Sequence, residues 1–289
     1  MPPLCPTLLL VTLLLLVVTV TSLVLSSIYC RAGFSGGAAE CPRHPRQLIR
    51  DMLSVVKRKP GGDGFAPPSD AETLVYAGEA VRLSKRYSRK VTPAMIRSMH
   101  GQVRSLAARN RASSSKGVVW SRYRKQSAPE LARELDLPPM MVYKNMNRNT
   151  RGPREDAEKI DAGSGVNQRA SQKRAFAYED VVGGQLCGAG ARFYTEEDLR
   201  KSGSRLTPDF LLKSPITVDG RSIHWMDAKN YIYYGNPLTL RGLVKQARKY
   251  TAAFGQGAMV FSGGVAEGAP PLGGALLVGA DWVGRVRVS

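Results

Sequence analysis

Two aspartates and one lysine in the C-terminal half have residue types and a spacing that suit metal-dependent hydrolysis. Asp209 precedes one apolar stretch, and Asp227 and Lys229 lie two residues apart at the end of the next. Carboxylates bind hard cations such as Mg²⁺, and a bound cation acidifies water and neutralises charge on a phosphate. An ammonium group beside them can orient that water or stabilise developing negative charge. These groups together favour hydrolysis of phosphodiesters.

A β-hairpin is needed to bring the three residues together. Residues 210–218 and 222–226 are rich in the apolar, β-branched and aromatic side chains that favour strands. Asp219-Gly220 lies between them, and an Asp-Gly pair flanked by apolar strand formers is a strong signal for a tight hairpin turn. The sequence therefore predicts two antiparallel strands over this region.

Alternation along the second strand places Asp227 and Lys229 on one face. The hairpin then brings Asp209 beside them, and the carbonyl of Ala228 can add an oxygen ligand. The same spacing also occurs on exposed hairpins with ordinary surface charges. The proline before Asp209 and the apolar strands favour the metal site. Without a cation, two neighbouring carboxylates repel each other.

The order of these residues resembles that of the TPD-motif nucleases, the codanin-interacting nuclease family of the PD-(D/E)XK superfamily. The resemblance is carried by Thr207-Pro208-Asp209-Phe210 and by residues 223–229, it includes the run 196–200, and it covers roughly residues 175–262. It implies an α/β restriction-endonuclease-like domain with a central mixed sheet flanked by helices. The implied activity is Mg²⁺- or Mn²⁺-dependent nuclease action, and the implied partners are nucleic acid and a codanin-like protein.

The resemblance also implies roles for residues outside the hairpin. Glu179 would complete the metal site, Gln246 would border the active site, and Tyr250 would face nucleic acid. Two departures stand out. Asp227 replaces the family's usual glutamate, which shortens its reach by one methylene. Glycines follow Glu179 and are expected to interrupt its helix, since each costs a helix about 1 kcal/mol relative to alanine.

The charge balance indicates a polyanionic partner. The chain has 42 Lys and Arg against 23 Asp and Glu, a formal net charge of +19. Residues 170–289 contain 15 basic and 10 acidic residues, so most of the excess lies in the N-terminal part. Such a field attracts nucleic acid. A solvated basic surface and contact with an anionic membrane remain alternatives.

A helix-turn-helix-like hairpin is predicted within the basic N-terminal part. Residues 127–135 and 138–147 have the apolar spacing of two short helices separated by a tight turn. Lys144, Asn145 and Arg148 would lie along or just past the second helix, where they can meet phosphates or base edges of DNA. The alternative is a hairpin that only packs.

Composition predicts five segments along the chain: an apolar N-terminal segment (1–30), a linker (31–70), a basic helical domain (71–150) in which Thr92-Pro93 starts a helix, a second linker (151–174) and the nuclease-like domain (175–289). The four cysteines are scattered, with no CxxC pair.

The run Leu8–Ile28 carries no charge and is long enough to span a bilayer. It is interpreted as a membrane anchor, a cleaved targeting segment, or residues upstream of the true start. A DNA enzyme is expected in the nucleus, with the cytoplasm as another location, whereas a retained segment would anchor the chain to a membrane or target it to an organelle. Two rival functions follow: a catalytically inactive scaffold that binds a codanin-like protein, and a membrane-anchored basic protein.

Overall fold

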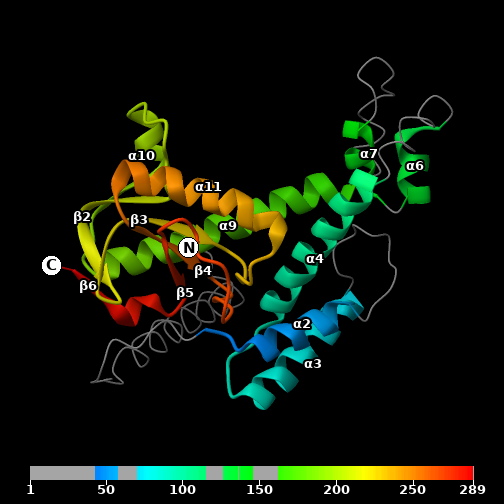
Figure 1. Ribbon diagram of the computed structural model, residues 1–289, viewed down its shortest axis with the longest axis horizontal. Helices are drawn as coiled ribbons and strands as arrows, with labels where there is room; N and C mark the ends of the chain where they lie inside the picture. Colours follow the sequence, from blue (N-terminus) through cyan, green and yellow to red (C-terminus); the bar gives the residue numbers. More distant parts are fainter. Residues whose placement is uncertain (1–42, 58–69, 115–125, 136, 146–161, 289) are drawn as a thin grey trace, which may run out of the picture. The chain divides into compact units, whose positions relative to one another are not determined.

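The computed structural model describes residues 43–57, 70–114, 126–135, 137–145 and 162–288. Its helices are α2 (Arg46–Lys57), α3 (Asp70–Tyr87), α4 (Pro93–Ser114), α6 (Ala128–Leu135), α7 (Pro139–Asn145), α9 (Ala162–Gly188), α10 (Glu196–Lys201) and α11 (Pro237–Phe254). Its strands are β1 (Phe193–Thr195), β2 (Phe210–Val218), β3 (Arg221–Lys229), β4 (Gly257–Phe261), β5 (Leu276–Gly279) and β6 (Val286–Val288) (Figure 1).

Within the described residues, the strands form one mixed sheet in the order β1-β2-β3-β4-β5, with β6 paired to β2. The first three strands are antiparallel, and β3, β4 and β5 are parallel. One apolar cluster joins Val182 and Leu186 of α9 to the sheet, and another joins Leu243 and Ala247 of α11 to it (Figure 1). The prediction of an α/β domain with a mixed sheet flanked by helices is confirmed.

The predicted hairpin is also confirmed. Asp219 and Gly220 have φ angles of 50° and 74° between β2 and β3, the pair of positive values that a type I′ turn requires. The Asp219 carboxylate forms an ion pair with Arg285 at 2.6 Å. The pairing is irregular between Leu211 and Ile216, and beyond this bulge the ladder runs to the charged end of β3.

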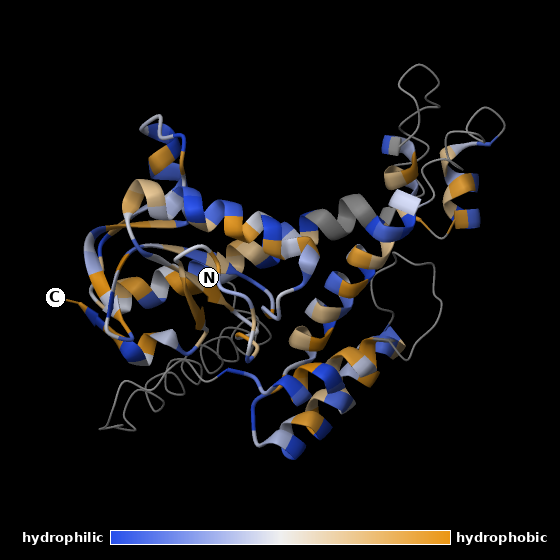
Figure 2. Ribbon diagram, viewed as in Figure 1, coloured by the Kyte–Doolittle hydropathy of each residue, from blue (hydrophilic) through white to orange (hydrophobic). Residues whose placement is uncertain are grey.

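The prediction of a linker is wrong for residues 46–57. They form α2, which packs with α3 and α4 through the fully buried side chains of Leu48 and Met52. Figure 2 shows apolar and polar residues intermixed along these helices. The apolar residues are spaced for a helix, but the Gly- and Pro-rich flanks hide the pattern.

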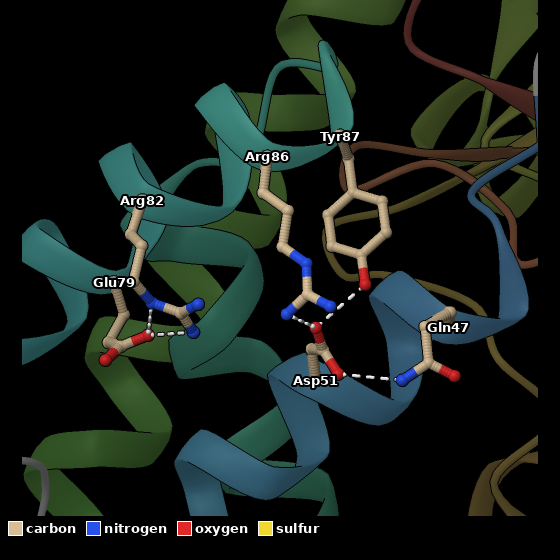
Figure 3. Close-up of polar contacts among 6 residues, drawn as sticks. All are labelled: Gln47, Asp51, Glu79, Arg82, Arg86 and Tyr87. Atoms are coloured by element: carbon tan, nitrogen blue, oxygen red, sulfur yellow. Dashed lines mark hydrogen bonds and ion pairs between the residues drawn. The ribbon is translucent and has the colours of Figure 1, made fainter.

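A polar network fastens α2 to α3. The Asp51 carboxylate accepts hydrogen bonds from Arg86 at 2.9 Å, from Tyr87 at 2.8 Å and from Gln47 at 3.0 Å (Figure 3). The Tyr87 hydrogen bond lowers the pKa of Asp51.

The predicted start of a helix at Thr92-Pro93 is confirmed. The Met95 N–H donates to the Thr92 hydroxyl at 3.3 Å, which satisfies one of the free donors in the first turn of α4.

The helix α9 crosses the predicted boundary at residue 174, and it contains the glycines that were expected to break it. At Gly183, a Cβ would lie 3.2 Å from the ring of Phe210. Close packing of α9 on β2 therefore uses the missing side chain, and the tertiary contact offsets the low helix propensity of glycine.

Two short helices, α6 and α7, are present where a helical hairpin was predicted. Ser127 and Glu130 form a reciprocal cap at the start of α6, with Ser127 N–H donating to Glu130 at 2.8 Å. Leu131 and Val142 are fully buried between the two helices. The arrangement is a packed hairpin, and DNA contact by it stays a prediction.

In the ranges that the structure describes, no helix is both long and apolar enough to cross a membrane. The run Leu8–Ile28 lies outside those ranges.

Candidate metal-dependent hydrolytic site

The backbone of β3 holds the carboxylate of Asp209. Its Oδ2 accepts a hydrogen bond from the N–H of Ala228 at 2.7 Å. The regular β2–β3 ladder ends at Phe210 and Met226, so the carboxylate takes the donor just beyond that end. The N–H and C=O of one strand residue point to the same neighbour. The carbonyl of Ala228 therefore faces the side of β3 on which Asp209 lies.

The other two residues of the motif pair directly. The Nζ of Lys229 lies 2.5 Å from the Oδ2 of Asp227, and the two side chains are 18% and 1% exposed. The buried Asp227 oxygen is therefore already paired with a cation of its own strand. The prediction that both side chains share one face of β3 is confirmed.

Burial and mutual repulsion set the ionisation of this group. Burial, followed by the charge of Asp227, raises the pKa of Asp209 to about 8. Burial lowers the pKa of Lys229, but the carboxylates of Asp227 and Asp209 outweigh it and raise that pKa above its usual range. Lys229 is therefore an ammonium group at neutral pH. It can supply positive charge and donate hydrogen bonds, but it cannot act as a base.

Glu179 stands at the edge of the same site. It is half-buried on α9, and burial, followed by the charge of Glu196, raises its pKa, while Lys229 opposes the shift. Glu179 and Asp209 line a cleft of about 590 Å³, whose other walls come from α9, β1, α10 and β2: Phe176, Asp180, Gly183, Gly184, Phe193, Thr195, Glu196, Glu197, Arg200 and Phe210. Most of the ionisable side chains that line the cleft are acidic, and Arg200 is the basic side chain among them.

The acidic side chains around Asp209 and Asp227 are the candidate ligands for a divalent cation. No group of three or more His, Cys, Asp or Glu side chains in the described ranges is gathered closely enough to hold a metal ion. Glu179 is thus not drawn in with the two aspartates. The aspartate pair itself fits a hard cation: the Asp227 carboxylate is buried and already attracts the Lys229 ammonium, and Asp209 has a raised pKa that a nearby positive charge would lower.

The helix α11 contacts the segment Thr207-Pro208-Asp209 from the interior of the domain. The Tyr250 hydroxyl donates to the carbonyl of Thr207 at 3.1 Å, and Gln246 Nε2 lies 3.4 Å from that hydroxyl. The Tyr250 ring packs edge-on against Trp225, with centroids 5.2 Å apart, and the side chain is 9% exposed. This is an interior position, not the surface position predicted for a residue that faces nucleic acid.

A hydrogen-bond network joins α10 to the segment before Asp209. Thr207 Oγ1 donates to Glu196 at 3.2 Å, and Arg200 donates to the same carboxylate oxygen at 2.6 Å. Thr195 and Asp198 form a capping box at the start of α10. Residues 196–200 therefore hold the segment before Asp209. In the sequence, only the resemblance to the TPD-motif family pointed to these residues.

The predicted nucleic-acid residues of the helical part lie apart from this site in the sequence. Lys144 is exposed on α7, and Asn145 is the last residue of that helix. Arg148 lies outside the described residues.

The region that contains the site matches a known sequence family. Residues 154–271 match the profile of the family described as "Protein of unknown function TPD sequence-motif". A stretch of 97 residues is 40% identical to the uncharacterized protein L539 of Acanthamoeba polyphaga mimivirus and covers 32% of this chain and 35% of that protein.

Shorter stretches match CDAN1-interacting nuclease 1. They are 39% identical over 59 residues in Mus musculus, covering 20% of this chain and 21% of that protein, and 46% identical over 37 residues in Homo sapiens, covering 13% of each. The chain thus spans about a third or less of the length of these relatives. No solved structure matches this chain.

Proposed function

We propose that this chain, whose residues 154–271 belong to the TPD sequence-motif family, is a metal-dependent nuclease of the PD-(D/E)XK kind that hydrolyses phosphodiester bonds, with DNA as the favoured substrate. One observation carries the proposal. The end of the β2–β3 hairpin gathers Asp209, Asp227 and Lys229, with the ammonium 2.5 Å from one carboxylate and the other carboxylate 2.7 Å from the Ala228 N–H. The similarity to proteins named as nucleases supports it.

Asp209, Asp227 and the carbonyl of Ala228 would hold Mg²⁺ or Mn²⁺. When bound, the cation supplies an acidified water and neutralises negative charge on the phosphate. Lys229 would orient the attacking water or stabilise negative charge as it develops on the phosphate. Glu179, with its raised pKa on the cleft wall, would assist from α9. Gln246 supports the site through the Tyr250 hydroxyl.

The helical part would add affinity for the nucleic-acid backbone. Most of the +19 net charge lies before residue 170, and attraction of this kind is independent of base sequence and weakens as salt is added. A codanin-like protein is proposed as a partner because two of the similar proteins are named as CDAN1-interacting.

The test is a cleavage assay on labelled single-stranded, duplex and flap DNA with Mg²⁺, Mn²⁺ or EDTA. The wild-type chain is compared with Asp209→Ala and Lys229→Met. Lys201→Met is the matched control, because Lys201 pairs with Glu197 at the surface with 70% of its side chain exposed. We expect cation-dependent cleavage that both site variants lose and the control keeps. Equal residual activity in all four proteins would show that the site does not catalyse cleavage and would favour an inactive scaffold.

A further inference from the structure

An exposed aromatic ring lies at the mouth of the acidic cleft. Phe176 on α9 is 58% exposed. Among the exposed large hydrophobic side chains of the described ranges, Tyr194 is the other aromatic, and its ring is covered by the Lys213 ammonium at 4.4 Å. A single exposed ring is common on protein surfaces, and what sets Phe176 apart is that it also lines the acidic cleft.

Phe176 lines two adjoining hollows. It forms part of the cleft that contains Glu179 and Asp209, and it also lines a shallower groove of about 410 Å³. The other residues of that groove all lie on α9: Arg169, Gln172, Lys173, Ala177 and Asp180. Phe176 and Asp180 line both hollows, so a ligand that extends from the groove into the cleft passes these two side chains.

Charge changes sign along this face of the helix. Arg169, Lys173 and Phe176 recur at the i, i+4 and i+7 spacing of one helical stripe. With a rise of about 1.5 Å per residue, Arg169 lies roughly 10 Å along the helix from Phe176, and Glu179 lies roughly 5 Å beyond the ring. Cations thus stand on the outer side of Phe176, and the carboxylates of Glu179 and Asp180 stand on the side of the cleft.

We propose that this face of α9 binds a single-stranded segment of DNA next to the scissile phosphate. Phe176 stacks on an unpaired base, and Arg169 and Lys173 contact the phosphates that follow. Proteins usually bind single strands with basic residues that follow the nucleic-acid backbone and with aromatic rings on which the bases stack. A base inside a duplex has both faces covered by its neighbours, and unstacking it costs a few kcal/mol. The inference rests on the proposed nuclease function only for the position of the scissile phosphate, which would lie beyond the Phe176 ring.

The experiment measures binding without cleavage. The full chain is titrated in EDTA with a fluorescein-labelled single-stranded oligonucleotide and, separately, with a blunt duplex, and anisotropy gives the dissociation constants. We expect Phe176→Ala to weaken binding of the single strand by about tenfold, with little effect on the duplex. Phe176→Tyr should restore it. Val181→Ala is the control, because Val181 is 51% exposed on the same helix and off the stripe.

The cations give an independent measure. Lys173→Ala should reduce the slope of log affinity against log salt for the single strand by about 0.7, the value for one lost phosphate contact. The surface variant Lys201→Ala should leave that slope unchanged. A Phe176→Ala protein that binds single strands as well as the wild type would overturn the proposal.

The two proposals can fail separately. Loss of affinity in Phe176→Ala together with no cleavage under any cation would remove the nuclease and keep the strand-binding face. Cation-dependent cleavage by a chain whose single-strand affinity is unchanged in Phe176→Ala would keep the nuclease and remove the strand-binding face.

Discussion

The carboxylate of Asp209 accepts the backbone N–H of Ala228 at 2.7 Å, so the residue that would hold a metal ion is itself fastened to the neighbouring strand. The contact does not depend on the side chain of Ala228. It fixes Asp209 beside Asp227 and Lys229 before any ligand arrives. The folded protein therefore holds two carboxylates close together in a buried place, which lowers its stability when both are charged.

Asp209→Asn is expected to stabilise the metal-free protein at neutral pH. Asparagine can still accept the Ala228 N–H, but it carries no charge. Folding raises the pKa of Asp209 from its ordinary value of 3.8 to about 8. The folded protein therefore binds more protons than the unfolded chain between those values, and its stability falls as pH rises through this window. In EDTA, the variant should melt a few degrees higher than the wild type near pH 8 and at the same temperature near pH 4.

The control for this prediction is Asp281→Asn, because Asp281 is a surface carboxylate that is 54% exposed. Its effect on the melting temperature should be small at both pH values. A wild-type protein that is as stable as Asp209→Asn near pH 8 would show that folding does not raise the pKa of Asp209.

Tyr250→Phe tests the interior support of the TPD segment. The hydroxyl that donates to the Thr207 carbonyl would be lost, at a cost of about 1 kcal/mol in stability. Because Asp209 lies two residues beyond Thr207, we expect kcat to fall while KM changes little. Tyr233→Phe is the matched control, since its hydroxyl donates to the Pro270 carbonyl at 2.7 Å. An equal loss of kcat in both variants would point to general destabilisation.

His100 makes the packing of α3 and α4 sensitive to acid. Its ring is buried against Tyr76, whose hydroxyl lies 2.7 Å from Nδ1. Burial, followed by the charge of Arg104, lowers the pKa of His100 below 6.5. The stability contributed by the neutral ring is complete above pH 6.5 and is lost as pH falls through the lowered folded value. His100→Gln should therefore have a shallower loss of stability on acidification.

Tyr76→Phe separates this effect from the hydrogen bond. It removes the bond but keeps the titrating ring, so stability should drop at every pH and the acid dependence should persist. A His100→Gln protein with the wild-type acid dependence would contradict the assignment.

Gly257→Ala tests the parallel pairing of β3 and β4. An added Cβ at Gly257, which pairs with Trp225, would lie 2.1 Å from the indole ring. Overpacking of this kind costs about 1–3 kcal/mol or more. Gly242→Ala in α11 is the matched control, because its Cβ would meet nothing within 4 Å and should stabilise the helix by about 1 kcal/mol. Chemical denaturation of both variants gives the comparison.

The hairpin and its charged end could be predicted because their signals are local. The Asp-Gly turn needs positive φ angles at adjacent residues, and alternation along β3 fixes which residues share a face. The resemblance at the TPD motif, which a family profile matches over residues 154–271, extended the prediction to Glu179, which lines the same cleft as Asp209.

Other features could not be predicted because they depend on distant contacts. The helix α9 tolerates Gly183 because the ring of Phe210 occupies the space of its side chain. Tyr250 is buried because its hydroxyl reaches a carbonyl 43 residues away in the sequence. The helix α2 was missed because its flanks are rich in glycine and proline, although its own residues are spaced for a helix.

Binding of Mn²⁺, measured by titration calorimetry, tests the central claim most directly, because it needs no substrate and no turnover. The wild-type chain should bind the ion, Asp209→Asn should weaken binding by at least about tenfold, and Asp281→Asn should bind it as the wild type does. Equal affinity in the wild type and Asp209→Asn, or no binding by the wild type at all, would contradict a shared cation at the end of the hairpin.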